Sequence, residues 1–265
     1  LLQQLENATI TPDKAEREKL LTIVIAGGGP TGVEVSGMLA EMRKFIIRKD
    51  YPEFRGEKDR SHIYLIDGGD QLLSPMSLKS QKDTFNALSK LGVEIKLNIE
   101  VKDYVNDTVV LSNGEHIQTK TLIWAAGVSA KPITGIPDAS YGRGKRLLTD
   151  AFNKVQNTSN IYAVGDTCLQ TNDPDFPQGH PQVAQVALQQ GKNLAINFKK
   201  MAAQQPLRPF RYRDKGTMAI IGRNKAVADL PKPPLHFRGF IAWFMWLFIH
   251  LISLVTYRNK ITTLY

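Results

Sequence analysis

Three glycines near the start of the chain have the spacing of a phosphate-binding turn. Gly27, Gly29 and Gly32 follow the apolar, β-branched run 21–26 and precede a stretch, 33–47, with apolar residues at helical spacing. A turn without side chains lets the backbone approach a pyrophosphate, and the free N–H groups of the next helix stabilise its charge. An ordinary strand-to-helix turn is the alternative. The strand, turn and helix order favours a dinucleotide site.

Two carboxylates are candidates for the rest of this site. Asp67 ends the apolar segment 62–66 and could accept the ribose hydroxyls, although it comes about 40 residues after the turn instead of the usual ~20. The polar stretch 48–60 explains the excess if it is an insertion. No Arg or Lys directly follows Asp67, so we expect NADH in preference to NADPH. Glu34, in the expected first turn of the helix, either complements the helix dipole or lies near the nicotinamide.

A second group of polar residues lies further along the chain. The apolar segment 160–164 predicts a buried strand that ends at Gly165-Asp166, where a carboxylate can accept hydrogen bonds from a polyol such as a ribityl chain. Gln185 and Gln189 follow on a predicted long helix. Because they are four residues apart, they share one face and suit a planar polar ligand. A solvated helix face is the alternative for this pair.

The C-terminal part of the chain combines apolar and basic residues. In 206–265, ten Lys and Arg oppose two Asp, so this region carries about +8 of the net charge of +9. The 18 residues 240–257 are strongly apolar, near the ~17 residue minimum for a bilayer span. Trp243, Trp246 and Tyr257 are typical of a membrane interface. We favour a helix that lies on the membrane surface over a spanning helix or a buried core or dimer helix.

An α/β framework is predicted to carry these residues. Strands at 21–26, 62–66, 93–97 and 122–124 alternate with helices, and a hairpin turns at Asn113-Gly114. This order predicts a doubly wound domain over 21–128. Further along, we expect a linker at 131–146, a helix at 181–201 and short strands near 216–221 and 226–228. Hydrophobic content of 42% indicates a globular chain.

Several classes of site are excluded or disfavoured. The single cysteine, Cys168, excludes a disulfide framework, and the five histidines lack metal-ligand spacing, so no metal site is predicted. Nucleic-acid binding is disfavoured because the basic residues lie beside an apolar helix instead of groove-lining aromatic residues. The chain has no initiator methionine or signal peptide and opens on a polar, helix-like stretch, 1–20, as expected for part of a larger protein.

Four motifs, in this order, resemble those of type II NADH:quinone oxidoreductases, the single-subunit, non-proton-pumping NADH dehydrogenases. They are GGGPTGVE at 27–34, WAAG at 124–127, YAVGD at 162–166 and AQVALQ at 184–189, the last being the most specific. The resemblance covers nearly the whole chain. It implies a Rossmann-like doubly wound NADH-binding domain and the C-terminal part of a second, FAD-binding α/β domain.

The resemblance also assigns residues to ligands. The NADH pyrophosphate would be held by Gly27, Gly28, Gly29, Thr31 and Gly32. The nicotinamide would be bordered by Glu34, Ala126 and Gly127. FAD would bind Gly165 and Asp166, and the flavin ring and the quinone would lie beside Ala184, Gln185 and Gln189. The expected catalytic residues are Glu34, Gln185 and Gln189.

The resemblance implies an activity and a division of the chain. Hydride would pass from NADH to FAD and electrons on to a membrane quinone, at the cytoplasmic face of the cell membrane. Residues 1–20 would be a linker helix, 21–128 the NADH-binding domain, 129–205 the remainder of the FAD-binding domain with the quinone-site helix, and 206–265 a peripheral membrane-associating region that contacts an anionic surface.

The resemblance also leaves alternatives. It implies missing segments at both ends, so we expect this polypeptide alone to be inactive. One alternative is a soluble flavin reductase of the disulfide or ferredoxin class, and another is a non-catalytic, nucleotide-binding membrane module. The sequence leaves open which quinone is used and whether the chain forms a homodimer.

Overall fold

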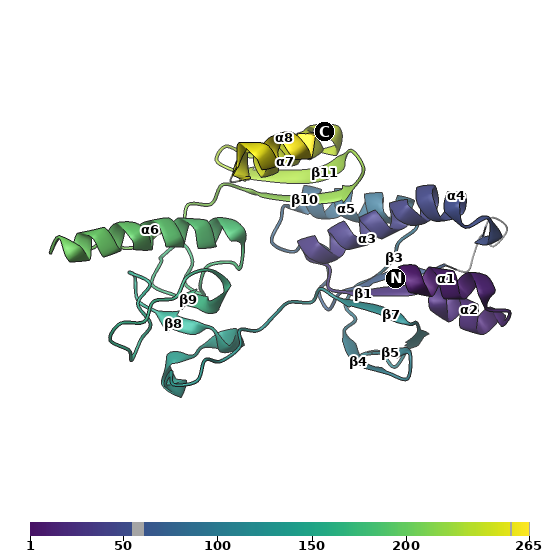
Figure 1. Ribbon diagram of the computed structural model, residues 1–265, viewed down its shortest axis with the longest axis horizontal. Coiled ribbons are helices and arrows are strands. Elements are labelled where there is room, and N and C mark those ends of the chain that lie inside the picture. The colour runs from purple at the N-terminus through teal and green to yellow at the C-terminus, as the bar shows by residue number, and fades with distance from the viewer. Residues whose placement is uncertain (55–60, 255, 265) are drawn as a thin grey trace. The chain divides into compact units, whose positions relative to one another are not determined.

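The chain folds into two compact units (Figure 1). The larger combines residues 1–127 with 215–265, and the smaller spans 128–214. The structure is a computed structural model that describes residues 1–54, 61–254 and 256–264. Most of the second half of the predicted insertion at 48–60 therefore lies outside the described residues, as does Val255 in the apolar run.

A parallel sheet of four strands forms the centre of the larger unit. Its strands are β1 (Ile23–Ala26), β2 (Ile63–Ile66), β3 (Glu94–Lys96) and β7 (Thr121–Trp124), in the order β3-β2-β1-β7. Every residue of β1 is buried, which is typical of a parallel strand covered on both faces. The α/β class predicted from the sequence is confirmed.

Helices cover one face of this sheet. They are α3 (Pro30–Met42) and α5 (Leu78–Lys90). Alternate strand residues, among them Ile25 and Leu65, pack with apolar residues of both helices in the largest buried cluster. Because strand side chains alternate between faces, the residues between them form a second core on the other side.

Strands, and not helices, cover the other face. The antiparallel strands are β4 (Val101–Val105), β5 (Thr108–Leu111) and β6 (His116–Gln118). Their apolar residues pack on Val24 and Ile66 of the parallel sheet. The predicted hairpin at Asn113-Gly114 is confirmed, since it joins β5 to β6, but its role as a covering layer was not predicted.

The N-terminal stretch 1–20 forms two helices, α1 (Leu2–Ile10) and α2 (Lys14–Leu21). The second begins at a side-chain cap, because Asp13 accepts a hydrogen bond from the Glu16 N–H at 2.7 Å. After α3 the helix continues through a π-helical turn, Arg43–Ile47, then α4 (Arg48–Asp50) and a 3₁₀ turn, Pro52–Phe54.

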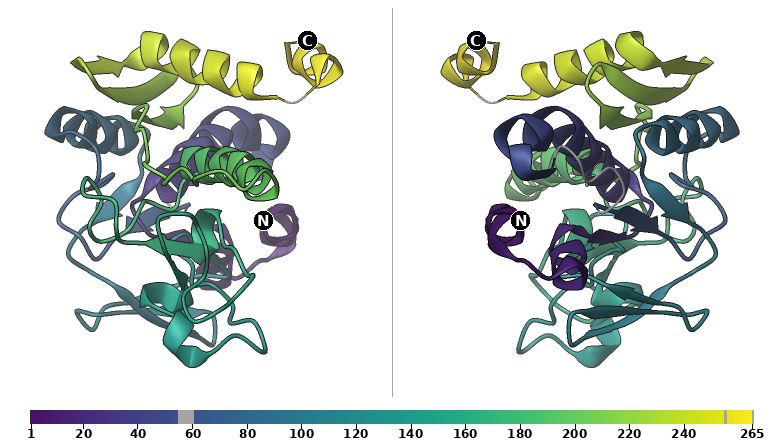
Figure 2. Two further views of the ribbon diagram at one scale, coloured as in Figure 1. Left: turned by 90° about the vertical axis from the view of Figure 1, so that its left-hand side faces the viewer. Right: turned by 90° about the vertical axis from the view of Figure 1, so that its right-hand side faces the viewer.

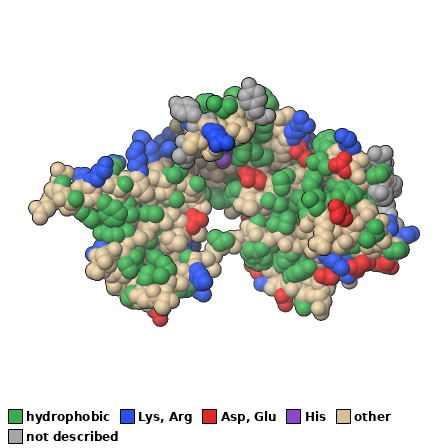
Figure 3. Space-filling model, in the orientation of Figure 1, with side chains coloured by type: hydrophobic (Ala, Val, Ile, Leu, Met, Phe, Trp, Pro, Cys, Tyr) green, Lys and Arg blue, Asp and Glu red, His purple; other side chains and the backbone are tan. Residues whose placement is uncertain are grey.

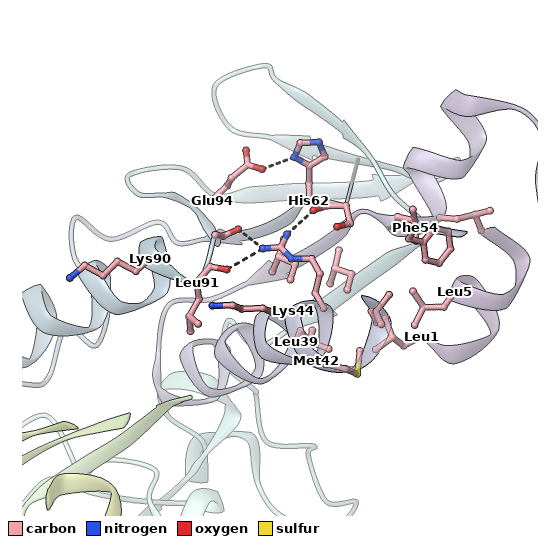
Figure 4. A pocket seen from close by; sticks show the side chains of 18 residues that line it. Leu1, Leu5, Leu39, Met42, Lys44, Phe54, His62, Lys90, Leu91 and Glu94 are labelled. Carbon is pink, nitrogen blue, oxygen red and sulfur yellow. Dashed lines mark hydrogen bonds and ion pairs between the residues drawn. The ribbon is translucent and has the colours of Figure 1, made fainter. Parts of the chain in front are cut away.

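A cavity of about 440 Å³ lies at the edge of the sheet where β1, β2 and β3 begin (Figure 4). Apolar side chains such as Leu5, Leu39 and Met42 line it. Arg43 closes one side by donating hydrogen bonds to the carbonyls of Ser61, Leu91 and Gly92. The predicted nucleotide site lies at the opposite edge, so this cavity is not that site.

An antiparallel meander follows the smaller unit in the chain and packs on the helices of the larger one. It comprises β10 (Thr217–Gly222), β11 (Lys225–Pro231) and β12 (Pro234–Arg238). Figure 2 shows α7 (Gly239–Ser253) on the side of this sheet that faces away from α3 and α5. The predicted strands near 216–221 and 226–228 are confirmed, whereas β12 was not predicted. The last helix is α8 (Tyr257–Leu264).

A polar cluster fastens the meander to α5. Asp229 of β11 accepts hydrogen bonds from the N–H of Ser77 at 2.8 Å and from the hydroxyls of Ser77 and Ser80 at 2.9 Å, so it caps the start of α5. His236 of β12 lies between Asp229, at 3.0 Å, and Asp83, at 3.1 Å. Burial alone would raise the pKa of Asp229, but these hydrogen bonds hold it below its ordinary value.

The smaller unit contains one pair of parallel strands and one long helix. The strands are β8 (Leu147–Thr149) and β9 (Cys168–Gln170), and the helix is α6 (Ala184–Ala202). The predicted linker 131–146 contains the 3₁₀ turns Asp138–Ser140 and Arg143–Lys145. The helix predicted from 181 begins three residues later, because Val183 is still extended as its N-cap.

The strand predicted at 160–164 is wrong. Among the described residues, Tyr162 makes only an isolated bridge with Lys154. The N–H of Ala163 bonds to the carbonyl of Asn153, and the N–H of Val155 bonds to the carbonyl of Ile161. The backbone groups of this apolar segment are therefore taken by a nearby loop and not by a strand ladder.

Replacing Asp229 tests the cluster that joins the meander to α5. Asp229→Asn should lower the free energy of unfolding by about 1–2 kcal/mol at pH 7, because the cap loses its charge. Because the pKa of Asp229 is lower in the folded protein than in the unfolded chain, its ionised carboxylate stabilises the fold above the unfolded pKa of about 3.9. This stabilisation is lost as the pH falls through the folded-state pKa. The difference in melting temperature between the variant and the parent should therefore disappear below about pH 4. An unchanged difference at low pH would contradict this account, and Asp70→Asn, at an exposed aspartate, serves as control.

Candidate functional site

Two positions between β1 and α3 require glycine because neighbouring backbone atoms leave no room for a side chain. A Cβ on Gly32 would lie 1.8 Å from the carbonyl oxygen of Gly27, and one on Gly27 would lie 2.5 Å from the carbonyl of Ala125. Gly27 also has a φ of +110°, which L side chains rarely adopt. These glycines let the helix start directly beneath the end of the central strand.

Gly29 differs from its neighbours because it faces open space. A Cβ there would meet nothing within 4 Å, and its φ of −71° suits any residue. It is the N-cap of α3 and is followed by Pro30 at the first helical position; no side chain among the described residues caps the helix. The first N–H groups of a helix have no partner within it, so this open end can receive an anion. Of the turn residues predicted to hold a pyrophosphate, Gly28 uses its N–H for Asp67, whereas Thr31 lies in the open first turn of α3.

Asp67 lies beside this turn, as the sequence predicted from its place after β2. One carboxylate oxygen accepts the N–H of Gly28 at 2.5 Å and the other accepts the N–H of Gly69 at 2.7 Å. Each oxygen can accept a further hydrogen bond, so the carboxylate can still receive ribose hydroxyls. The side chain therefore also holds the glycine turn in place, which the sequence did not indicate.

Ala126 and Gly127 lie at the same edge of the sheet, after β7. The N–H of Ala125 bonds to the carbonyl of Ala26 at the end of β1, which brings this segment against the glycine turn. Gly127 has a φ of +99° and open space around it. The structure thus gathers three of the predicted nucleotide-binding segments at the carboxyl ends of neighbouring parallel strands, the usual place for ligands in such sheets.

Glu34 lies beyond the first turn of α3, which corrects the expectation that it belongs to that turn. Its carboxylate accepts the N–H of Ile220 on β10 at 3.3 Å. Burial raises the pKa of Glu34, opposed by this hydrogen bond and by the nearby His250 of α7. Glu34 therefore connects the nucleotide-binding helix to the meander, and a raised pKa makes it able to carry a proton closer to neutral pH.

In the smaller unit, Gly165 and Asp166 form a 3₁₀ turn, Gly165–Thr167, beside α6. Gly165 has a φ of +70°, and a Cβ on it would lie 3.1 Å from the Cβ of Ala187. The Asp166 side chain is exposed. The turn thus presents a carboxylate close to the start of the helix that carries the glutamines, which suits a polyol ligand.

The two predicted glutamines share a face of α6, as their spacing indicated. Both are half-buried, and Ala184, the first residue of the helix, is exposed. The amide of Gln189 accepts the N–H of Arg213 at 3.1 Å and donates to its carbonyl at 2.9 Å. Gln189 therefore already anchors a neighbouring segment of the smaller unit by both of its amide atoms.

Gln190 is a residue that the sequence analysis did not single out. It is buried and accepts the N–H of Gly165 at 2.7 Å. The signal was present in the buried stripe of α6, since three amide residues, Gln190, Asn193 and Asn197, follow Val186 at helical spacing where apolar side chains are expected.

The dinucleotide fold and the glycine turn are those of a known class of redox enzymes. The pattern of the pyridine nucleotide-disulphide oxidoreductases matches residues 2–191, most of the chain. The chain therefore belongs to the pyridine nucleotide-disulphide oxidoreductase family. Within it, the resemblance to type II NADH:quinone oxidoreductases is confirmed, because the NDH2 C-terminal domain matches residues 215–265.

Curated relatives agree with this placement. The chain is 34% identical to the type II NADH:quinone oxidoreductase NdhA of Mycobacterium tuberculosis over 100% of its own length and 57% of that protein. It is 33% identical to an internal alternative NAD(P)H-ubiquinone oxidoreductase of Solanum tuberosum mitochondria, over 94% of this chain and 52% of that one. The chain thus spans little more than half the length of these relatives.

Solved structures share the fold. NDH2 of Plasmodium falciparum, determined in complex with NADH, superposes with a TM-score of 0.86 at 20% identity, over 98% of this chain and 68% of that one. A ferredoxin reductase from Rhodopseudomonas palustris reaches a TM-score of 0.51 at 14% identity, over 79% and 47%. In the described residues no helix is long and apolar enough to cross a membrane, and no cluster of His, Cys, Asp and Glu could hold a metal.

Alanine substitutions at Gly32 and Gly29 distinguish a glycine that the fold requires from one that the fold does not require. Gly32→Ala should lower the free energy of unfolding by about 3 kcal/mol, because backbone must move away from the new Cβ. Gly29→Ala should change it by less than about 1 kcal/mol, because its Cβ enters open space. Chemical denaturation of both variants measures this difference. Equal effects at the two positions would show that the turn is not closed as described.

Proposed function

We propose that the protein is an NADH dehydrogenase that passes hydride from NADH to FAD and electrons on to a membrane quinone, without pumping protons. The observation that carries the proposal is the open, uncapped N-terminus of α3 behind a glycine turn, with Asp67 beside it. The relatives support it, because one is a type II NADH:quinone oxidoreductase and another is an NAD(P)H-ubiquinone oxidoreductase.

In this proposal the larger unit holds NADH. The N–H groups at the start of α3 bind the pyrophosphate, and Asp67 receives the hydroxyls of one ribose. Gly127 leaves room for the nicotinamide at the end of β7 because no side chain fills that space. Glu34 lies further along α3 and holds a proton near this end of the site. The NADH-binding domain is accordingly assigned to 21–128, after a linker at 1–20.

The smaller unit contributes to the flavin and quinone sites. We assign 129–205 to the FAD-binding domain, in which the exposed Asp166 binds the ribityl or phosphate region. Gln185 and Ala184, at the exposed start of α6, face the flavin ring and the quinone. Gln189 shapes the same pocket through the Arg213 segment that it anchors. When bound, FAD supplies the hydride acceptor, so no nucleophilic side chain is needed.

The region 206–265 is proposed to dock on an anionic membrane at the cytoplasmic face. In the described part of the chain, α7 exposes six large apolar side chains: Phe240, Ile241, Phe244, Phe248, Ile249 and Ile252. Figure 3 shows hydrophobic side chains at the surface of the C-terminal region. Arg238, at the start of α7, is 73% exposed. An apolar face flanked by basic residues binds the headgroup region of a bilayer. Quinone can then enter from the lipid without crossing water.

Anaerobic flavin absorbance tests the activity directly. The full-length protein loaded with FAD should lose its flavin absorbance when NADH is added and regain it when a soluble quinone follows. Bleaching without recovery would move the acceptor to the soluble reductase class, and no bleaching would refute the dehydrogenase. Gly29→Ala should bleach only at NADH concentrations roughly tenfold higher, because its Cβ occupies the pyrophosphate position.

Vesicle binding tests the docking surface. Phe244→Glu should weaken binding to vesicles that contain anionic lipid by roughly tenfold, since a half-exposed phenyl ring no longer enters the bilayer. Leu78→Glu is the matched control, because Leu78 is 78% exposed but lies on α5. Co-sedimentation at low and high salt measures both variants. Equal binding by the parent and Phe244→Glu would rule out α7 as the membrane contact.

A further inference from the structure

Gln190 contacts the residues at both ends of the short turn that carries Asp166. Its Oε1 accepts the N–H of Gly165 at 2.7 Å, and its Nε2 donates to Sγ of Cys168 at 3.5 Å. Gly165 begins the turn that carries Asp166, and Cys168 comes directly after it. Gln190 is only 1% exposed; its contact with Cys168 is buried and its contact with Gly165 is partly buried.

The sulfur that receives Gln190 is itself held in place. Cys168 is buried, lies 3.2 Å from the hydroxyl of Thr149 and accepts the amide of Asn153 at 3.6 Å. Burial raises the pKa of the Cys168 thiol, so the group remains neutral at physiological pH. A neutral thiol surrounded by polar neighbours serves as a fixed anchor for an amide.

Two further contacts restrict the position of the turn that carries Asp166. Gln182 donates to the carbonyl of Asp166 at 3.3 Å, and Ala187 would touch any Cβ placed on Gly165. Backbone atoms on both sides of the Asp166 side chain are therefore bonded to residues of α6 or of the segment just before it. The carboxylate itself stays exposed at the surface.

We propose that Gln190 is a positioning residue that fixes the turn carrying Asp166 against α6. The distance between the flavin-binding carboxylate of Asp166 and the quinone-facing Gln185 is thereby kept constant. This inference rests on the proposed function, since it assumes that Asp166 binds FAD. Gln190 acts through Gly165 and touches neither ligand. Its neighbour Gln189 bonds to a different segment, at Arg213.

The contacts predict which properties depend on Gln190. Without its acceptor, the partly buried N–H of Gly165 loses its partner and the turn moves to recover one. The Asp166 carboxylate then shifts relative to bound FAD. The dissociation constant for FAD should rise about tenfold, and the flavin midpoint potential should change because hydrogen bonding to the cofactor changes. NADH binding, in the other unit, should keep its affinity.

Gln190→Met in the full-length protein tests the proposal. Asn197→Leu is the matched control, because Asn197 is an equally buried amide on α6 that anchors Arg208, far along the helix from the turn. Both variants should lower the melting temperature, but only Gln190→Met should weaken FAD binding, shift the midpoint potential and raise KM for quinone. Gln190→Glu keeps the acceptor for Gly165 and should restore part of the FAD affinity.

The outcomes separate this inference from the proposed function. If the parent is bleached by NADH and the two variants differ as stated, the positioning role is supported. If the parent is bleached but Gln190→Met has the FAD affinity and potential of Asn197→Leu, Gln190 is only a packing residue and the inference is overturned. If the parent neither binds FAD nor is bleached, the proposed function fails first.

Discussion

The larger unit depends on the contact between Gly32 and the carbonyl of Gly27. With hydrogen alone at position 32, α3 can begin directly beneath the end of β1, and its free N–H groups then point along the edge of the sheet. Asp67 strengthens this geometry by accepting the N–H of Gly28. One steric constraint therefore sets both the packing of the central strand and the direction of the positive end of the helix.

The same helix connects the nucleotide site to the C-terminal region. A Cβ on Gly37 would lie 1.8 Å from the carbonyl of Ile221, so α3 and β10 are in backbone contact. Glu34 bonds to Ile220 on that strand, and Asp229 caps α5 from the next strand. The meander that precedes the apolar helix α7 is thus fixed to α3 and α5, so a membrane-bound α7 would hold the larger unit at the bilayer.

The sequence predicted elements with strong periodicity and missed those defined by distant partners. The strand before Gly27 and the helix after Gly32 were predicted because local apolar patterns specify them. The segment 160–164 was predicted as a strand because it is apolar. Its backbone hydrogen bonds instead join Ala163 to Asn153 and Ile161 to Val155 of a nearby loop. β12 was missed because it follows Pro231 and Pro233 and begins at Pro234. Asp67 could be found by its position after a strand. Gln190 left only an indirect signal, an amide in the buried stripe of α6, because its partner Gly165 lies 25 residues away in the chain.

The central claim is that the start of α3 holds the pyrophosphate of NADH. Amide hydrogen exchange of Thr31 and Gly32, measured with and without NADH, tests it most directly because these N–H groups belong to the first, unpaired turn of the helix. We expect slower exchange at both positions when NADH is present, with no change at the far edge of the sheet around Ile63. Unchanged exchange at Thr31 and Gly32 under saturating NADH would contradict it.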